Sequence, residues 1–400
     1  MSTTAVADHV SIVDEPVVIN YEPPTHESWF SRHRSTREGI AFAVAFFAVS
    51  RALTAFCVYA GTSLVPGRNM RESFLAWDSG WYYGLVLHGY PHVAYDPNTP
   101  GSAANTIAFF PLYPLMVRFL HNVSPLTVLQ SGITVSLVGG ALASAFIWLL
   151  ARRLTNEKTA SRAIVLFCLF PGSVSVLLMM SEGVMLALSA ASLYFLLKRQ
   201  WVLAGILAAC ATATRPTAIV LVACALWASA MAIRETRDWK SLAAPLLAPC
   251  GILAYFVFLR HHTGNFFAWN LVEEKGWAYG DLGHFYGFKS FHVFFQNPLV
   301  DLNASATAIG IMLAGTGLVL MALWRPPFAI TVFVLGILVL ATFSGGWGSK
   351  IRYVYSAFPI AIAAAHWAKT DLRFLSLAST AGVSLAVYTI LVTQTTHSIL

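Results

Sequence analysis

Charged residues are scarce in this chain of 400 residues, where Asp, Glu, Lys and Arg make up 11%, against roughly 25% in an average soluble domain. Hydrophobic residues make up 57%, which excludes a large soluble catalytic domain. The five cysteines have no C-x-x-C spacing, so neither a disulfide framework nor a zinc site is indicated. The formal charge of +7 lies in short segments between apolar runs and does not indicate a nucleic-acid surface. The composition predicts an all-α, polytopic membrane protein.

Apolar segments long enough to cross a bilayer recur along the chain. We predict about 11 membrane spans, at 39–64, 127–151, 163–180, 183–197, 201–214, 216–233, 242–260, 304–323, 327–343, 353–368 and 374–394. Residues 1–38 are polar, acidic and proline-bearing, which predicts a disordered cytoplasmic tail before a single transmembrane domain at 39–400. The segment from Arg199 to Arg234 is broken by Arg215-Pro216, so we expect two short crossings there.

The distribution of basic residues predicts the orientation of the chain in the membrane. With the N-terminus in the cytoplasm, most of the 25 lysine and arginine residues fall in short inner loops. The segments 65–126 and 261–303 then form long outer loops, and loops of this length are often functional. The pattern of 73–90 and 108–120 predicts short helices along the membrane surface. The aromatic residues of the second loop suit either an interfacial belt or a surface that stacks sugars.

Asp78 is the first candidate for chemistry. It lies in Trp77-Asp78-Ser79-Gly80-Trp81-Tyr82-Tyr83, just outside the first predicted span. A carboxylate at such a place can take the proton of an attacking hydroxyl group. The alternative is an aspartate that caps the helix starting at Ser79. His88 and His92 follow, but no carboxylate at helical spacing completes a metal site with them.

Four basic residues are candidates for binding a phosphate group. Arg51 lies inside the first span, where a charge is expensive and suggests a function; its alternatives are an ion pair with Glu182 or snorkelling to an interface. Arg215 lies between two short spans at the outer interface. Lys350 and Arg352 follow a glycine-rich stretch whose backbone N–H groups suit a phosphate, although lipid headgroups would use the same residues.

Glu182 lies in Ser181-Glu182-Gly183, which is a tight outer turn between two apolar runs. A side chain that points inward from this turn would bind a sugar hydroxyl or hold Arg215. A side chain that points outward would be an ordinary loop residue.

Several short motifs occur together and in a fixed order. They are W-D-x-x-W-Y at 77–82, H-G-Y at 88–90, A-F-F-P at 108–111, F-C-x-x-P at 167–171, the pair Ser181-Glu182, A-T-R at 213–215 and R-Y…P from Arg352. The set resembles the PIG-V family, which comprises the glycosylphosphatidylinositol mannosyltransferase 2 enzymes and their bacterial relatives with GT-C glycosyltransferase architecture. Eukaryotic members read R-S-N-G where this chain has Arg215-Pro216-Thr217-Ala218, so acceptor recognition there differs.

The resemblance implies an inverting transfer of mannose from a polyprenyl-phosphate-mannose donor to a lipid-linked glycan acceptor, with Asp78 as the general base. It places the protein in a bacterial plasma membrane among membrane lipids, with the active site on the extracytoplasmic face. The candidates for the donor phosphate are Arg352, Arg215, Lys350 and Arg51, and those for substrate contact are Trp77, Trp81, Tyr82, His88, Glu182 and Tyr353. No cofactor is certain, and a divalent metal is not indicated.

Two other functions suit the same architecture. One is the transfer of another sugar, such as arabinose or glucose. The other is a lipid or sugar transporter or flippase, which commonly has two halves of similar hydropathy. No internal repeat is evident, and both long loops are predicted on one face, which favours an enzyme.

Overall fold

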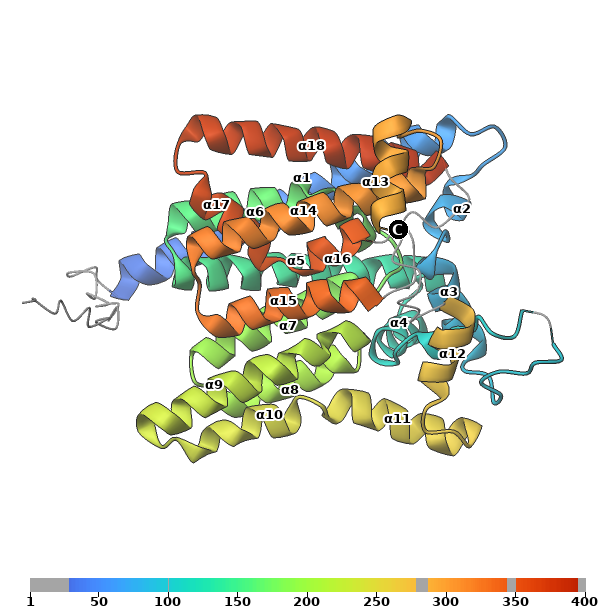
Figure 1. Cartoon of the computed structure of the whole chain (residues 1–400), viewed down its shortest axis with the longest axis horizontal. Coiled ribbons are helices and arrows are strands. Elements are labelled where there is room, and N and C mark those ends of the chain that lie inside the picture. Colours follow the sequence, from blue (N-terminus) through green and yellow to red (C-terminus); the bar gives the residue numbers. More distant parts are fainter. Residues whose placement is uncertain (1–28, 100, 278–286, 344–349, 395–400) are drawn as a thin grey trace, which may run out of the picture.

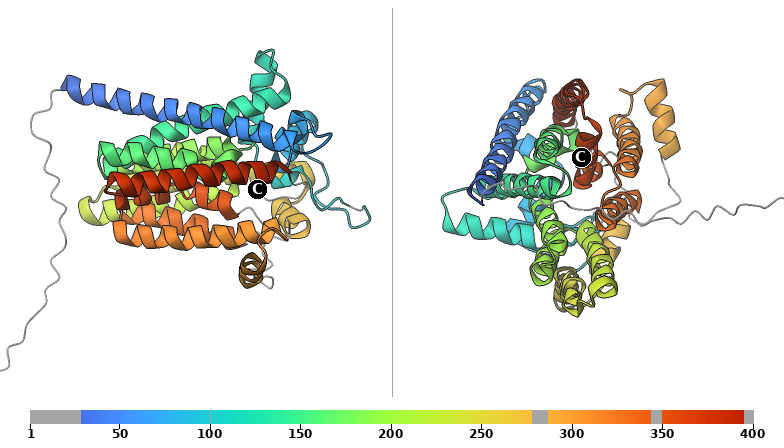
Figure 2. Two further views of the ribbon diagram at one scale, coloured as in Figure 1. Left: turned by 90° about the horizontal axis from the view of Figure 1, so that it is seen from above. Right: turned by 90° about the vertical axis from the view of Figure 1, so that its left-hand side faces the viewer.

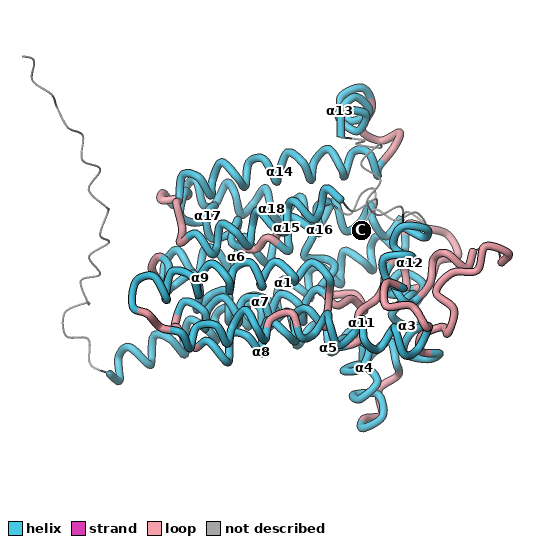
Figure 3. Tube along the Cα trace, turned by 60° about the horizontal axis from the view of Figure 1, so that its bottom comes forward, coloured by secondary structure: helices cyan, strands magenta, loops and turns pink. Residues whose placement is uncertain are grey.

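The computed structural model describes residues 29–99, 101–277, 287–343 and 350–394. Within these ranges every regular element is a helix (Figure 3), as the composition predicts. The long helices lie side by side in a bundle, and most of the short helices gather at one end of it, opposite the amino-terminal end of the first helix (Figures 1 and 2). The predicted all-α class of the protein is therefore confirmed.

The long helices form the bundle. They are α1 (Trp29–Ser63), α5 (Val128–Leu154), α6 (Glu157–Leu169), α7 (Glu182–Leu197), α8 (Trp201–Thr212), α9 (Val220–Thr236), α11 (Cys250–Thr263), α14 (Leu302–Trp324), α15 (Phe328–Phe343) and α18 (Asp371–Gln394). The shorter helices are α2 (Met70–Phe74), α3 (Asp78–His88), α4 (Leu112–Val123), α10 (Ala243–Leu247), α12 (Ala268–Trp277), α13 (Gly287–Gln296), α16 (Lys350–Ser356) and α17 (Pro359–Trp367). Four 3-10 turns complete the described elements, namely η1 (Thr106–Ala108), η2 (Pro171–Val176), η3 (Pro216–Ile219) and η4 (Trp239–Leu242).

Length and composition identify the helices that suit a membrane. Six described segments are long and apolar enough to cross one, namely Ser35–Ser63, Val128–Leu154, Pro216–Thr236, Trp239–Thr263, Leu302–Trp324 and Asp371–Gln394. Three shorter apolar helices are Glu182–Leu197, Trp201–Thr212 and Phe328–Ala341. These segments overlap all the predicted spans except 163–180 and 353–368, so a count of 11 is not confirmed.

Both exceptions are broken next to a proline. A residue before proline is driven into an extended conformation, and proline cannot continue a helix that precedes it. Phe170 is extended (φ −62°, ψ 139°), so α6 ends at Leu169 and the chain continues as the short turn η2. The later segment is split between α16 and α17 at Pro359, which has no N–H group to donate to the preceding turn, although Phe358 itself keeps a helical conformation (φ −51°, ψ −25°). Neither predicted span is therefore one continuous helix.

The amino-terminal boundary also differs from the prediction. Helix α1 begins at Trp29, ten residues before the predicted span at 39, so the last part of the predicted tail 1–38 is helical. Residues 1–28 lie outside the described residues, as does the glycine-rich stretch 344–349. The predicted surface helices of the first long loop correspond to α3 and α4.

The segment around Arg215 does pass through the bundle twice. Arg199, ahead of α8, forms an ion pair with Glu235, near the end of α9, at 3.1 Å. Arg215, between the two helices, pairs instead with Glu182 at the first residue of α7. Since α7 runs from Glu182 to the residues just before Arg199, α8 and α9 must run in opposite directions. The two short passes predicted from Arg215-Pro216 are therefore present.

Residues predicted for the inner loops gather at the other end of the bundle. Arg152 donates to Ser35, at 3.0 Å, and Arg153 donates to the carbonyl of Leu197 at 3.0 Å. Arg162 pairs with Asp371. The bundle thus has one end rich in basic residues and a second end where the long loops lie. Which end faces the cytoplasm stays a prediction.

Candidate active site

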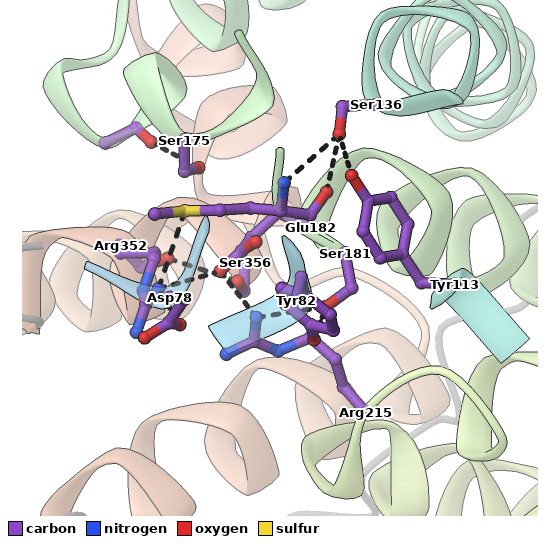
Figure 4. A network of polar contacts seen from close by, with 12 residues as sticks. Asp78, Tyr82, Tyr113, Ser136, Ser175, Ser181, Glu182, Arg215, Arg352 and Ser356 are labelled. Carbon is purple, nitrogen blue, oxygen red and sulfur yellow. Dashed lines mark hydrogen bonds and ion pairs between the residues drawn. The ribbon is translucent and has the colours of Figure 1, made fainter. Parts of the chain in front are cut away.

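Four charged side chains from distant parts of the sequence meet at the second end of the bundle (Figure 4). Arg352 donates to Asp78 with an N···O distance of 2.5 Å and lies 3.3 Å from Glu182. Arg215 donates to the same Oε1 atom of Glu182 at 2.6 Å. Two carboxylates and two guanidinium groups thus form one connected, formally neutral cluster.

The cluster is withdrawn from solvent but retains hydrogen-bonding capacity. The side chain of Glu182 is 0% exposed and that of Arg352 7%, whereas the side chain of Asp78 is 20% exposed. Glu182 Oε2 and Arg352 Nε have no hydrogen-bond partner among the described residues. Buried polar atoms without partners are uncommon in folded proteins and often mark a functional site. Solvent or a substrate can therefore reach the cluster from the side on which Asp78 lies.

The backbone before Asp78 is strained. Trp77 has φ 56° and ψ −134°, a conformation that is costly for a residue with a side chain. Asp78 is the first residue of α3, where Gly80 N–H donates to the carbonyl of Trp77. Asp78 therefore does lie at a helix start, but its carboxylate is engaged by Arg352, which the capping interpretation does not explain.

Proline places Arg215 in the cluster. Arg215 is extended (φ −153°, ψ 144°), as expected for a residue before proline, and Pro216 begins η3. Helix α8 therefore ends at Thr212, and the Arg215 side chain reaches across to α7 instead of continuing along α8. Pro216 thus ends α8 early and directs this guanidinium group toward α7.

The 3-10 turn η2 determines how closely the helix that carries Arg352 can approach. A Cβ atom added to Gly172 would lie 2.8 Å from the carbonyl oxygen of Ile351 and 3.2 Å from Cα of Arg352. The absence of a side chain at Gly172 thus allows η2 and α16 to approach closely. This approach sets the depth at which Arg352 enters the bundle.

Tyr82 and Ser181 connect the first loop to the cluster. The Tyr82 hydroxyl donates to Ser181 Oγ at 2.6 Å, and Arg215 donates to the same Oγ at 3.2 Å. Burial raises the pKa of Tyr82 well above its ordinary value, so the side chain stays a neutral phenol. Tyr82 therefore positions Arg215 through Ser181.

Two further predicted site residues, Trp81 and His88, lie at different distances from the charged cluster. Trp81 lies one turn beyond Asp78 and contacts Phe109 and Trp277, with ring centroids 6.2 and 5.4 Å apart. His88 is exposed at the far end of α3, about 15 Å along the helix from Asp78 at 1.5 Å per residue. The structure thus brings Trp81 close to the cluster and leaves His88 outside it.

Lys350 and Tyr353 lie on the same short helix as Arg352 but contact different groups. Lys350 donates to the carbonyl of Ala341 and lies over the Tyr353 ring, 6.0 Å from its centroid. Successive residues two apart on a helix point in nearly opposite directions, which separates Lys350 from Arg352.

Arg51 lies in α1, is buried, and does not contact Glu182. Its guanidinium group donates to the carbonyls of Cys168 and Ser173 and to the Ser173 hydroxyl. These carbonyls belong to the turn where α6 gives way to η2, and the missing helix leaves them free. The predicted alternative of an ion pair with Glu182 is wrong, because Glu182 is held by Arg215 and Arg352.

Glu273 of α12 was not among the predicted site residues. Its side chain interacts electrostatically with Asp78 and Arg215, and burial raises its pKa to about 8. The sequence contains a signal that could have found it, since Trp269, Glu273 and Trp277 follow at intervals of four in the aromatic second loop. Four-residue spacing places side chains on one face of a helix.

In the part of the chain that the structure describes, no group of three or more His, Cys, Asp or Glu side chains is arranged to hold a metal ion.

Three comparisons place the chain among known proteins. Residues 110–261 match the model of a family described as dolichyl-phosphate-mannose-protein mannosyltransferase. The match includes Glu182 and Arg215 but neither Asp78 nor Arg352. No curated protein matches the sequence.

The fold is similar to solved membrane-protein structures. ArnT from Cupriavidus metallidurans, bound to undecaprenyl phosphate, aligns with a TM-score of 0.52 at 14% identity, covering 82% of this chain and 61% of ArnT. The Archaeoglobus fulgidus oligosaccharyltransferase, in complex with zinc and sulfate, aligns with a TM-score of 0.48 at 14% identity, covering 86% and 53%. This chain thus spans less than two thirds of either. The likeness to ArnT shows that the chain has a GT-C-like fold, the architecture that the sequence motifs predict.

Proposed function

We propose that this protein is a membrane glycosyltransferase that moves mannose from a polyprenyl-phosphate-mannose donor to a lipid-linked glycan acceptor. The observation that carries this proposal is the meeting of Asp78, Glu182, Arg215 and Arg352 beside the short helices of the first loop. A partly exposed carboxylate beside two guanidinium groups suits the deprotonation of a hydroxyl and the binding of a phosphate leaving group. The mannosyltransferase match and the fold of ArnT, which binds undecaprenyl phosphate, support the donor class.

The two arginines would hold the donor phosphate. Arg352 now donates to Asp78, and phosphate oxygens would compete for the same N–H groups because guanidinium and phosphate form bidentate pairs. Glu182 would keep Arg215 in place, since their contact is buried and short. Donor binding would therefore release Asp78 from its ion pair at the moment when a base is needed.

The transfer itself is a single displacement. The acceptor oxygen attacks the anomeric carbon while the bond from that carbon to the phosphate oxygen breaks, and the electron pair leaves with polyprenyl phosphate. The acceptor proton passes to Asp78, and the configuration at the anomeric carbon inverts. Trp77, which precedes α3, and Trp81 on α3 would line the sugar site beside Asp78, and the buried Tyr82 would support that site through Ser181.

The location of the cluster suits amphiphilic substrates. A polyprenyl carrier and a glycolipid keep their tails in the bilayer and their sugars in the aqueous layer. Charged groups at one end of a bundle of apolar helices would meet those sugars at the membrane surface. We place that surface on the extracytoplasmic face of a bacterial plasma membrane, with the N-terminus in the cytoplasm.

The test uses membranes from cells with and without this chain. Radiolabelled GDP-mannose loads the endogenous polyprenyl carrier, and we expect a labelled glycolipid that is lost when the chain is deleted. A product that depends on the chain with UDP-glucose but not with GDP-mannose would correct the sugar and keep the enzyme class. The absence of any chain-dependent glycolipid, together with a chain-dependent change in lipid or sugar transport, would contradict the proposal.

A further inference from the structure

Helix α12 presents one face to the first loop. Trp269 donates from its indole N–H to the carbonyl of Ala108 at 3.3 Å and lies edge-on to Phe110, with centroids 5.9 Å apart. Two turns later, Trp277 lies edge-on to Trp81 at 5.4 Å. Glu273 is four residues from each tryptophan, so it is on the face of α12 that packs against the first loop.

Trp81 links this face to the cluster. Trp81 is three residues after Asp78 in the first turn of α3, so the two side chains are neighbours on the helix surface. Its indole remains 36% exposed despite its contacts with Phe109 and Trp277. A flat ring bound against Trp81 would therefore lie between Asp78 and Glu273.

Glu273 differs from its neighbour in the sequence. Glu274 is exposed and pairs with Lys275 at 2.7 Å, as surface carboxylates commonly do. Glu273 is half-buried, and among the described residues no lysine or arginine lies within ion-pair distance of it. A half-buried carboxyl group without a cation is costly unless a polar partner reaches it.

We propose that Glu273, Trp277 and Trp81 form the binding site for the acceptor sugar, with the sugar ring against the indoles and a hydroxyl group hydrogen-bonded to Glu273. Sugars combine weakly polar faces with a rim of hydroxyl groups, and aromatic rings beside a carboxyl group match both features. The hydroxyl that reacts would point to Asp78, and a second hydroxyl of the same residue would be held by Glu273. This assignment rests on the proposed transferase function and names the part of the site that selects the acceptor.

The test compares Glu273→Leu, which removes every hydrogen-bonding atom of the side chain, with its matched control Glu274→Leu in the purified full chain. Transfer is measured from radiolabelled polyprenyl-phosphate-mannose to a dilution series of total lipid extracted from cells lacking the protein. We expect Glu273→Leu to raise the half-saturating amount of acceptor lipid by about 3- to 10-fold, the effect of one lost hydrogen bond. The maximal rate and the donor KM should stay within about twofold, and Glu274→Leu should match wild type.

Trp277 supplies a second measurement. Trp277→Ala should raise the half-saturating acceptor amount, and Trp277→Phe should recover part of the loss because an aromatic face remains. Identical acceptor curves for wild type and Glu273→Leu would overturn the proposal, as would a lower maximal rate at unchanged half-saturation. A wild-type protein that transfers sugar to no lipid would instead overturn the function on which it rests.

Discussion

Asp78 is the residue on which the proposed chemistry depends. Asp78→Asn preserves the size of the side chain and a hydrogen bond to Arg352 but removes the group that accepts a proton. We expect turnover to fall by at least ~10², the low end of general-base contributions, with donor binding retained. The measurement is single-turnover transfer from the labelled donor. Asp96→Asn is the control, because the Asp96 carboxylate accepts hydrogen bonds from Asn98 and Thr99 within its own loop. Near-normal turnover in Asp78→Asn would remove Asp78 from the mechanism.

Arg352 serves stability as well as binding, because it neutralises two carboxylates. Arg352→Met should lower the free energy of unfolding by about 3–5 kcal/mol, the usual cost of removing one partner from a buried ion pair. Adding Asp78→Asn should restore part of that loss, since one uncompensated charge is removed with it. Thermal denaturation in detergent measures both variants, with the exposed Arg260→Met as control. If the loss in free energy of unfolding of the double variant equals the sum of the losses of Arg352→Met and Asp78→Asn, the two residues do not interact.

Glu273 makes stability depend on pH in a defined direction. Its pKa in the folded protein is raised to about 8 from 4.5, so between these values the folded chain keeps a proton that the unfolded chain releases. Stability must therefore fall as pH rises through that window and level off above it. The melting temperature of Glu273→Gln minus that of wild type should rise from pH 4.5 to 8. A constant difference, as expected for the exposed Glu274→Gln, would show that Glu273 titrates normally.

Sequence motifs named all four members of the cluster but only one of the contacts between them. Asp78, Glu182 and Arg215 stood out because each interrupts an apolar or aromatic run, and the Glu182–Arg215 contact was one of the predicted alternatives. The contact between Arg352 and Asp78 spans 274 residues and depends on where η2 packs, which no local pattern encodes. Glu273 was missed because its role depends on which face of α12 meets the first loop.

The contact between α5 and α7 holds Glu182 at its depth in the bundle. A Cβ atom added to Gly139 would lie 2.6 Å from backbone atoms of Gly183 and Val184, so the two helices touch through their backbones there. Gly139→Val should push α7 outward, lower the melting temperature and reduce turnover by displacing Glu182. Gly315→Val is the control, because Gly315 of α14 has nothing within 4 Å of its added Cβ. Equal activity of the two variants would mean that this crossing does not position the site.

Helix breaks are where prediction from hydropathy failed. Segments 163–180 and 353–368 are apolar enough to be read as spans, yet Pro171 and Pro359 interrupt them. In a soluble protein the freed carbonyls would face water, whereas here a side chain from another helix supplies the donors. At the first break that side chain is Arg51, more than a hundred residues away, so this break could be suspected from Pro171 but not established from it.

The arrangement of the whole bundle requires Thr99 and Lys240 to lie on opposite sides of the membrane. Both are exposed, Thr99 in the first long loop and Lys240 after α9 at the basic end. In a chain whose accessible Cys210 and Cys250 are replaced by alanine, Thr99→Cys should react with an impermeant maleimide in intact cells. Lys240→Cys should react only after lysis. The reverse pattern would place the charged cluster on the cytoplasmic face, out of reach of an extracytoplasmic donor.

The contacts of Arg51 have a consequence for biosynthesis. Arg51 precedes Ser173 by 122 residues, so α1 leaves the ribosome long before the carbonyls that receive its guanidinium group have been made. An unpartnered arginine in a bilayer is costly, and water or lipid headgroups must solvate it until α6 and η2 arrive. Helix α1 therefore reaches its final position in the bilayer only after α6 and η2 have been synthesised. In a nascent chain truncated before Cys168, α1 is therefore inserted in the membrane less stably than in the complete protein.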